Sequence, residues 1–378
     1  MIIDKTKNTS VGLIKCVYVL CLLFSLPICQ VMGATVSTVD KQVLQQVVSI
    51  CNNVILSDTT NNSIQKHFIK SQLDAFIDNY EILVDSELVT DATRLTQLFH
   101  SSEVAMDHEI RLRSKTGGAY SWFKINSPEG IDIINLPLVE VYTDGKGLAY
   151  IRWRLCKTGA VAQVIKELLN VNHELKGVFI DVRGNPGGHL VEAVVFADQW
   201  LPKHKEILRL SNSIDDFLEE RFSLIFRTRT DKKWDFPVIF ITDKHTASTA
   251  EAMVAVFKSN KIGISVGQPT KGDALAYSVT DSVDNSTQGT PRISLICVPD
   301  FPLYHNRGIT PDYFWNGKIR RESLFENAKD YYSALGVGGK NLHTFEEQCC
   351  LLVNFVLKGV ENKNKQKGKH LCQQITNK

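Results

Sequence analysis

The sequence predicts an α/β fold with a largely parallel sheet, preceded by a helical segment. Three observations support this prediction. Apolar residues make up 43% of the chain and charged residues 22%, a balance typical of a protein with a sizeable buried core. The pattern changes near residue 145 from helical spacing to alternating strands and helices. Several of the strands are nearly all apolar, as expected where both faces of a sheet are covered. These features exclude a disordered, collagen-like or coiled-coil protein.

Charge and cysteine content narrow the range of partners. The 43 Lys and Arg against 41 Asp and Glu leave a formal charge of +2, so there is no basic surplus for binding nucleic acid. Nine cysteines are too few for a disulfide scaffold, and the spacing of those after residue 33 matches no zinc pattern. We therefore expect no metal and no cofactor. The sequence leaves open whether one or two disulfides form in an oxidising compartment, and it does not assign their pairing.

The first 33 residues are typical of a signal peptide. Three lysines precede an apolar run over residues 16–29, and small residues follow at positions 33 and 34. A membrane anchor needs about 20 apolar residues. This run has 14 and contains Pro27. Cleavage is therefore favoured over an anchor, and over lipid attachment at Cys29. We expect an exported protein, periplasmic or secreted, with no stable membrane span.

Residues 34–113 are predicted to form a helical N-terminal domain. Apolar residues recur there at intervals of three and four, which is the period of one helix face. They are Leu44, Val47, Val48, Cys51 and Val54, and then Ile69, Leu73, Phe76, Ile77 and Tyr80. Residues 114–146 are richer in Gly, Pro and turns, and are predicted to form an irregular or β connecting region.

Residues 147–338 are predicted to form the core domain. The expected strands are 147–154, 177–182, 206–210, 237–242 and 262–266, and the expected helices are 161–169, 190–201 and 249–259. This succession is typical of a parallel sheet with crossover helices. Residues 339–378 are predicted to form a terminal helix, over 345–357, and a basic tail.

The first candidate functional segment is Asp181-Val-Arg-Gly-Asn-Pro-Gly-Gly188, between a predicted strand and a helix. The glycines allow a sharp turn and leave backbone amides uncovered by side chains. Amides at the start of a helix suit a negative or developing-negative oxygen. Taken alone, the segment is more simply explained as a turn that only connects a strand to a helix, and we favour that interpretation.

The second candidate segment is His245-Thr-Ala-Ser-Thr-Ala-Glu251. It puts Ser248 at a predicted helix start, where amides and the helix dipole lower the energy of a nearby oxyanion. Ser248 and Glu251 also match S-x-x-E, a capping box that needs no catalysis. Taken alone, the cap is the favoured interpretation.

The two segments are part of a longer stretch of sequence that resembles a known protein family. Residues 147–315 resemble the catalytic core of the carboxyl-terminal processing, or tail-specific, serine peptidases. The segments GLAYIRWR, KGVFIDVRGNPGGHLVEAVVFADQWLP, PVIFITDKHTASTAEAM, GISVGQPTKGD and NRGITPDY stand in that family's order. The HTAS-x-AE form is also similar to the branch containing interphotoreceptor retinoid-binding protein. The resemblance implies a core related to the ClpP and crotonase folds, a serine nucleophile, and cleavage of peptide bonds near the carboxyl termini of proteins. We expect the substrate to be an unstructured polypeptide.

The same resemblance implies roles for individual residues. Ser248 matches the nucleophile, and the amides of Gly187 and Thr249 match the oxyanion hole. The family has a lysine base where this sequence has Asp273, and a carboxylate is a much weaker base than a neutral amine. Lys271 is the first candidate base, because residues 271 and 273 point the same way in an extended strand. An upstream histidine is the alternative, His108 before His100.

Other functions remain open at this point. The position of Asp273 also fits a catalytically inactive protein that binds a peptide or another ligand on the same fold. An acyl-CoA enzyme of the crotonase type would share the paired oxyanion amides, but the export signal argues against it. The PDZ module common in the family is not recognisable in residues 101–145.

Overall fold

The structure is a computed structural model. It describes residues 36–57, 63–85, 87–100, 108–117, 119–125, 133–171, 175–279, 291–316, 319–329, 331–332, 348–349 and 351–353. The predicted signal peptide and the basic tail lie outside these ranges. No helix within them is long and apolar enough to cross a membrane.

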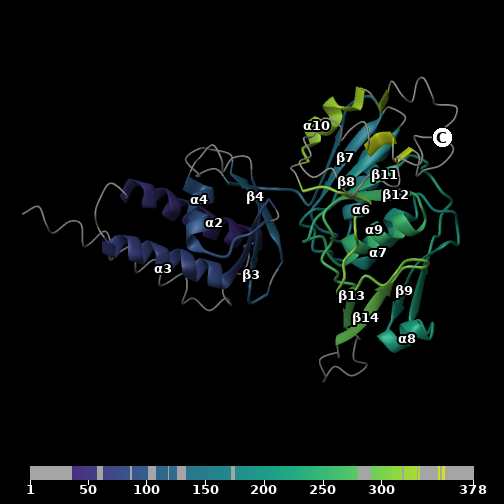
Figure 1. Ribbon diagram of the computed structural model, residues 1–378, viewed down its shortest axis with the longest axis horizontal. Helices are drawn as coiled ribbons and strands as arrows, with labels where there is room; N and C mark the ends of the chain where they lie inside the picture. Colours follow the sequence, from purple (N-terminus) through teal and green to yellow (C-terminus); the bar gives the residue numbers. More distant parts are fainter. Residues whose placement is uncertain are drawn as a thin grey trace, which may run out of the picture.

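The N-terminal part combines helices with a sheet (Figure 1). The helices are α2 (Val36–Ser57), α3 (Ser63–Asn79) and α4 (Ala92–His100). The strands are β1 (Tyr80–Val84), β2 (Glu87–Leu88), β3 (Glu109–Ser114), β4 (Ser121–Ile125) and β5 (Ile133–Asn135), in the order β2-β1-β3-β4-β5. Apolar side chains from both layers, among them Leu44, Leu73, Ile110 and Phe123, form one buried cluster.

This sheet differs from the predicted helical domain over residues 34–113. Helical spacing does hold along α2 and α3, where Val47, Cys51 and Phe76 are buried as expected. After Tyr80, however, β1 and β3 pair along their length in antiparallel register. β4 and β5 continue the sheet into the region expected to be only a connection. The strands are short and mix charged with apolar residues, so the helical pattern before them masked their alternation.

The core part is built on a six-stranded sheet in the order β15-β12-β11-β8-β7-β6. Its strands are β6 (Val139–Thr143), β7 (Leu148–Trp153), β8 (Gly177–Asp181), β11 (Val238–Thr242), β12 (Gly263–Gly267) and β15 (Tyr313–Phe314). All neighbours are parallel except β6 and β7. The result is a mixed α/β fold with the largely parallel sheet that the sequence predicts.

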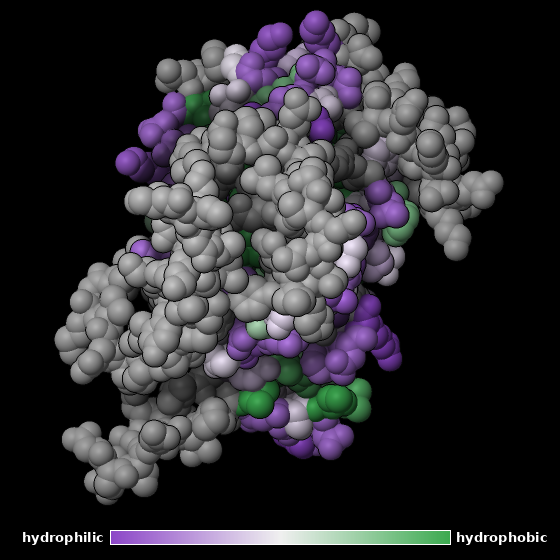
Figure 2. Space-filling model, turned by 90° about the vertical axis from the view of Figure 1, so that its left-hand side faces the viewer, coloured by the Kyte–Doolittle hydropathy of each residue, from purple (hydrophilic) through white to green (hydrophobic). Residues whose placement is uncertain are grey.

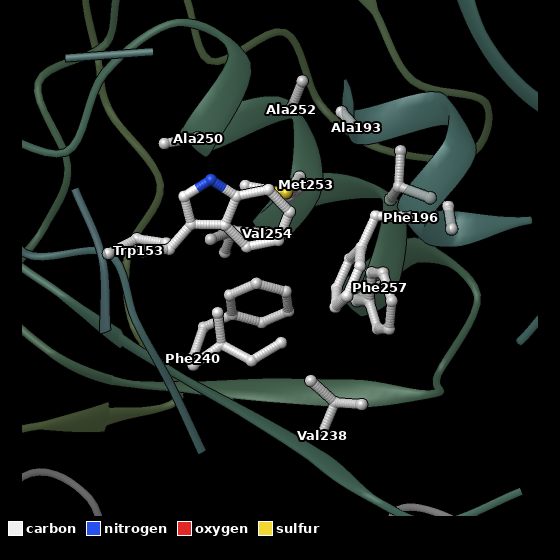
Figure 3. Packing of buried hydrophobic residues seen from close by; sticks show 14 of the residues in the cluster. Trp153, Ala193, Phe196, Val238, Phe240, Ala250, Ala252, Met253, Val254 and Phe257 are labelled. Carbon is white, nitrogen blue, oxygen red and sulfur yellow. The ribbon is translucent and has the colours of Figure 1, made fainter. Parts of the chain in front are cut away.

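Helices cover both faces of this sheet. α6 (Ala160–Leu169), α7 (Leu190–Ala197) and α9 (Thr249–Ser259) lie over one face, and α10 (Arg321–Glu326) lies over the other (Figure 1). Each face of the sheet therefore has its own cluster of buried apolar side chains, and neighbouring residues of β8 enter different clusters: Ile180 packs under α6, α7 and α9, and Phe179 packs on the side of α10. Figure 3 shows the cluster that contains Ile180, where the ring centres of Phe257 and Phe240 lie 5.2 Å apart. Burial on both faces explains why these strands are nearly all apolar.

A second sheet, which the sequence did not separate from the first, extends from the core. Its order is β10-β9-β14-β13, with β9 (Glu206–Ser211), β10 (Leu224–Arg227), β13 (Leu275–Val279) and β14 (Pro291–Cys297), and the short helix α8 (Ile214–Leu218) lies beside it. Leu218 of α8 and Tyr277 of β13 are exposed apolar side chains. Figure 2 shows green, apolar surface at the lower end, where α8 lies in Figure 1. Within this sheet, β13 starts beside the loop that contains Ser248.

Candidate active site

The two candidate segments meet at one edge of the parallel sheet. β8 and β11 are parallel neighbours with Ile241 opposite Asp181, so the loops that follow them leave at the same level. A Cβ atom placed on Gly187 would lie 2.6 Å from the Cβ of Ser248 and 2.9 Å from the amide nitrogen of Thr249. Gly187 also has φ of 96°, in the left-handed region that favours glycine. Only glycine therefore permits this approach.

Ser248 has a strained backbone. Its φ of 53° and ψ of −120° are unusual for a residue with a side chain, a strain of roughly 1–3 kcal/mol. The residue precedes α9, and its hydroxyl lies 3.4 Å from the carbonyl oxygen of Leu275. The hydroxyl is thus directed toward the start of β13 and meets an acceptor that cannot take its proton.

Glu251 joins the serine loop to the loop that precedes β13. Its buried carboxylate accepts the amides of Ser248, Gly272 and Asp273 at 2.9, 2.7 and 2.8 Å, and also the Thr270 hydroxyl. Burial raises the pKa of Glu251, and these donors work in the opposite direction. The predicted capping residue therefore accepts the Ser248 amide, and in addition fixes residues 270–273 next to the serine.

The two residues expected to supply the oxyanion donors differ in the hydrogen bonds that they make. Thr249 is the first residue of α9, and its hydroxyl donates to the Gly188 carbonyl at 2.8 Å, which ties the helix start to the glycine loop. The Gly187 amide donates to Oδ1 of Asn185 at 2.8 Å. This second contact was not predicted, and it means that the Gly187 amide is satisfied within its own loop.

A buried ionic network at the end of β8 supports the glycine loop. Asp181 is fully buried and accepts from Nε of Arg183 at 2.9 Å and from the Tyr150 hydroxyl at 2.6 Å. Arg152 lies 3.7 Å from the same carboxylate. Burial alone would raise the pKa of Asp181, but Arg183 and Arg152 outweigh it and hold that pKa well below its usual range.

Neither candidate base contacts Ser248. The side chain of Lys271 is 59% exposed, and its Nζ atom lies 3.5 Å from Oδ2 of Asp273. His108 lies just before β3, where its Nδ1 atom is 2.6 Å from Oδ2 of Asp85. His100 ends α4, and its side chain lies outside the described residues. The structure therefore brings Ser248, Gly187 and Thr249 together but leaves Lys271 and His108 with other partners.

A third histidine, His245, lies on the serine loop. Burial lowers its pKa, and the neighbouring Asp243 partly offsets this effect. Its amide donates to Oδ1 of Asp243 at 3.0 Å. Within the described part of the chain, no group of His, Cys, Asp or Glu side chains is arranged to hold a metal ion.

Sequence reasoning missed two residues of β3 that reach this site. Arg111 donates to the Gly184 carbonyl, and Glu109 pairs with Arg152 and Arg154. The alternation Glu109-Ile-Arg-Leu-Arg113 is a strand pattern with one charged face. That pattern could have predicted the strand. It could not have predicted that Arg111 contacts a loop some 70 residues further along the chain.

Replacing Gly187 with alanine tests the close approach. Gly159→Ala is a matched control, because Gly159 has φ of 90° and open space around its missing Cβ. The control should lose about 1–2 kcal/mol of unfolding free energy through backbone strain alone. Gly187→Ala should lose a further ~1–3 kcal/mol through overpacking against Ser248. Urea denaturation measures both losses, and equal losses would contradict the close approach of Gly187 to Ser248.

Replacing Asp181 with asparagine tests the buried ionic network. The variant leaves Arg183 without its carboxylate and Arg152 with Glu109 alone, so it should lose about 3–5 kcal/mol of unfolding free energy at pH 7. Because the pKa of Asp181 is lowered in the folded state, its stabilisation is complete above the unfolded-state pKa of about 3.9 and is lost as the pH falls below it. The difference from the parent protein should therefore shrink between pH 5 and pH 3.

Denaturant unfolding at pH 7, 5, 4 and 3 measures that difference. Asp235→Asn serves as the control, since Asp235 is an exposed carboxylate beside Lys232. A loss for Asp181→Asn that stays constant or grows toward pH 3 would refute the ionic origin.

Comparison with known proteins finds relatives of the core part of the chain. Residues 147–314 match the family model of Peptidase family S41. The carboxyl-terminal-processing protease of Synechocystis is 25% identical over 173 residues, which cover 44% of this chain and 38% of that protein. The carboxy-terminal processing protease CtpB of Bacillus subtilis is 26% identical over 231 residues, which cover 56% of this chain and 46% of that protein. The matched part spans less than half the length of these relatives.

A solved structure also matches. The photosystem II D1 C-terminal processing protease aligns with a TM-score of 0.39 and 17% identity, covering 63% of each chain. The sequence matches confirm the resemblance drawn from the motifs: residues 147–314 of this chain match the model of Peptidase family S41, and the chain is similar to the carboxyl-terminal processing proteases.

Proposed function

We propose that this protein is an exported serine endopeptidase of the carboxyl-terminal processing type, with Ser248 as nucleophile. The observation that carries the proposal is the close approach of Gly187 both to Ser248, whose backbone is strained, and to the first amide of α9. Strained backbone concentrates at functional sites, where the surrounding structure maintains it. A serine that only capped a helix would need neither the strain nor the glycine.

In the proposed reaction, Ser248 Oγ attacks the scissile carbonyl carbon and its proton passes to a base. The Thr249 amide and the Gly187 amide donate to the oxyanion, for which Gly187 exchanges its bond to Asn185. Collapse of the tetrahedral intermediate breaks the peptide bond, and the base returns its proton to the leaving amine. Water then hydrolyses the acyl-serine ester. Each oxyanion donor contributes roughly 10²–10³ in kcat.

The wider assignment follows from the same proposal. Residues 147–338 form a ClpP- or crotonase-like protease core, and residues 34–146 form an N-terminal unit that precedes it. The substrate is an unstructured polypeptide, because an extended chain is needed to reach a serine between two loops and a strand. The three lysines and the apolar run of residues 16–29 support export with removal of the first 33 residues.

One observation favours a second candidate, a catalytically inactive peptide- or ligand-binding protein. Asp273 stands at the position matching the family's lysine, and its main chain is held beside Ser248 through Glu251. Lys271, the nearest alternative amine in sequence, extends into solvent. A site with no base keeps the shape of the peptidase and loses its reaction.

Ser248→Ala separates the two candidates. Hydrolysis of an unfolded fluorescent casein and labelling by a fluorophosphonate probe should both disappear in this variant. Ser213→Ala is the matched control, since Ser213 also precedes a helix and its hydroxyl accepts the Asp216 amide at 3.0 Å. The control should keep both activities. Hydrolysis that persists in Ser248→Ala would exclude Ser248 as the nucleophile, and no hydrolysis by the parent protein would favour the binding function.

Replacing each candidate base identifies the proton acceptor. General-base catalysis contributes typically ~10²–10⁴-fold, so Lys271→Gln should lower kcat by about 100-fold or more. His108→Gln should leave kcat within about twofold if the histidine only pairs with Asp85. The reverse pattern would transfer the role to His108. Unchanged kcat in both variants would contradict both assignments, and Asp273→Asn would then be the decisive variant.

A further inference from the structure

The glycine loop is held through its carbonyl groups by arginines connected to β3. Arg152 donates to the carbonyls of Asp181 and Arg183 at 3.2 and 2.8 Å. Arg111, on β3 itself, donates to the carbonyl of Gly184. Three carbonyls at the start of the loop therefore accept from cations that bridge the N-terminal sheet and the core.

Glu109 anchors one side of this bridge. Its carboxylate pairs with Arg152 and accepts from Nε of Arg154 at 2.8 Å. Burial would raise the pKa of Glu109, but the two arginines outweigh it and the pKa is lowered. Glu109 is therefore charged at neutral pH, and the arginine that holds the loop is itself held by β3.

Arg111 makes the direct contact. It is buried, it donates to Oε1 of Glu81 at 3.0 Å, and its guanidinium lies 4.6 Å from the centre of the Tyr120 ring. On the core side, the amide of Gly184 donates to Oδ1 of Asp243 at 2.9 Å. Gly184 is thus fixed at both its polar groups, with φ of 67°. This fixes the direction in which the chain enters residues 185–188, including the amide of Gly187.

We infer that Arg111 is a positioning residue for the oxyanion loop, through which the N-terminal sheet controls the reactivity of Ser248. Figure 1 shows β3 on the side of the N-terminal part that faces the core. The N-terminal part then does more than precede the protease core: the glycine loop depends on β3 for its geometry. This inference rests on the proposed function for its catalytic consequence, but not for its structural one.

Arg113 provides a matched control. It lies two residues further along β3, donates to Oε2 of the same Glu81 at 2.8 Å, and stacks on the same Tyr120 ring at 4.4 Å. Among the described residues, it makes no hydrogen bond to the glycine loop, whereas Arg111 does. Arg111 is also the more buried of the two, so the informative difference between Arg111→Gln and Arg113→Gln is one located in residues 184–188, which reports the contact with Gly184.

The first experiment is kinetic. A displacement of about 1 Å in a catalytic group can lower the rate by about 100-fold, so Arg111→Gln should lower kcat roughly 10- to 100-fold with KM within about twofold. The rate of fluorophosphonate labelling should fall in parallel. Arg113→Gln should keep kcat and labelling within about threefold of the parent. Arg111→Lys, which keeps the charge but lacks the fork that reaches Glu81 and Gly184 together, should lie between them.

The second experiment does not depend on catalysis. Hydrogen exchange of peptides covering residues 184–188 should be at least about tenfold faster in Arg111→Gln than in Arg113→Gln, because local opening of the loop becomes easier. If Arg111→Gln does not fold, the same comparison is made with Arg111→Lys.

The outcomes separate the two proposals. Faster exchange in a protein whose parent form hydrolyses nothing would support the positioning role and remove the peptidase function. Equal exchange and equal kcat in the Arg111 and Arg113 variants, in an active enzyme, would overturn the positioning role alone.

Discussion

The approach of Gly187 to Ser248 is the constraint on which the rest of the site depends. A side chain at residue 187 would occupy the space between the serine and the first amide of α9. The parallel register of β8 and β11 brings the two loops to the same level, but register alone does not determine the conformation of either loop. Each loop therefore has its own buried anchor, Asp181 for the glycine loop and Glu251 for the serine loop.

The two anchors have opposite electrostatic characters. Asp181 is surrounded by cations that favour its charged form, whereas burial raises the pKa of Glu251, whose hydrogen-bond partners are neutral amides and a hydroxyl. Both arrangements satisfy buried polar groups, which would otherwise be costly. Together they hold the strained backbone of Ser248 in place, Glu251 through the Ser248 amide and Asp181 through the glycine loop that packs against the serine. Such strain persists only where the surroundings over-determine it.

Periodicity was enough to predict the core, because strands covered on both faces are nearly all apolar, and β7, β8, β11 and β12 all lie within a residue or two of their expected bounds. It failed where charged residues alternate with apolar ones in a short strand, as in β3. The pairing of Gly187 with Ser248 followed from family motifs. The Gly187–Asn185 bond and the outward direction of Lys271 depend on the detailed conformation of irregular loops, which periodicity does not predict. The contact of Arg111 with Gly184 is a tertiary contact that no local pattern contains.

The hydrogen bonds around residues 270–273 limit how a base can reach Ser248. The Lys271 amide donates to the Thr246 carbonyl at 2.9 Å, and the next two amides donate to Glu251. Shifting this loop to bring Lys271 inward would break all three bonds and leave a buried carboxylate short of donors, which is unfavourable. A shifted loop is therefore the expensive route. Rotation of the Lys271 side chain away from Asp273 breaks one solvent-exposed ion pair, which is worth little, and leaves the main chain in place.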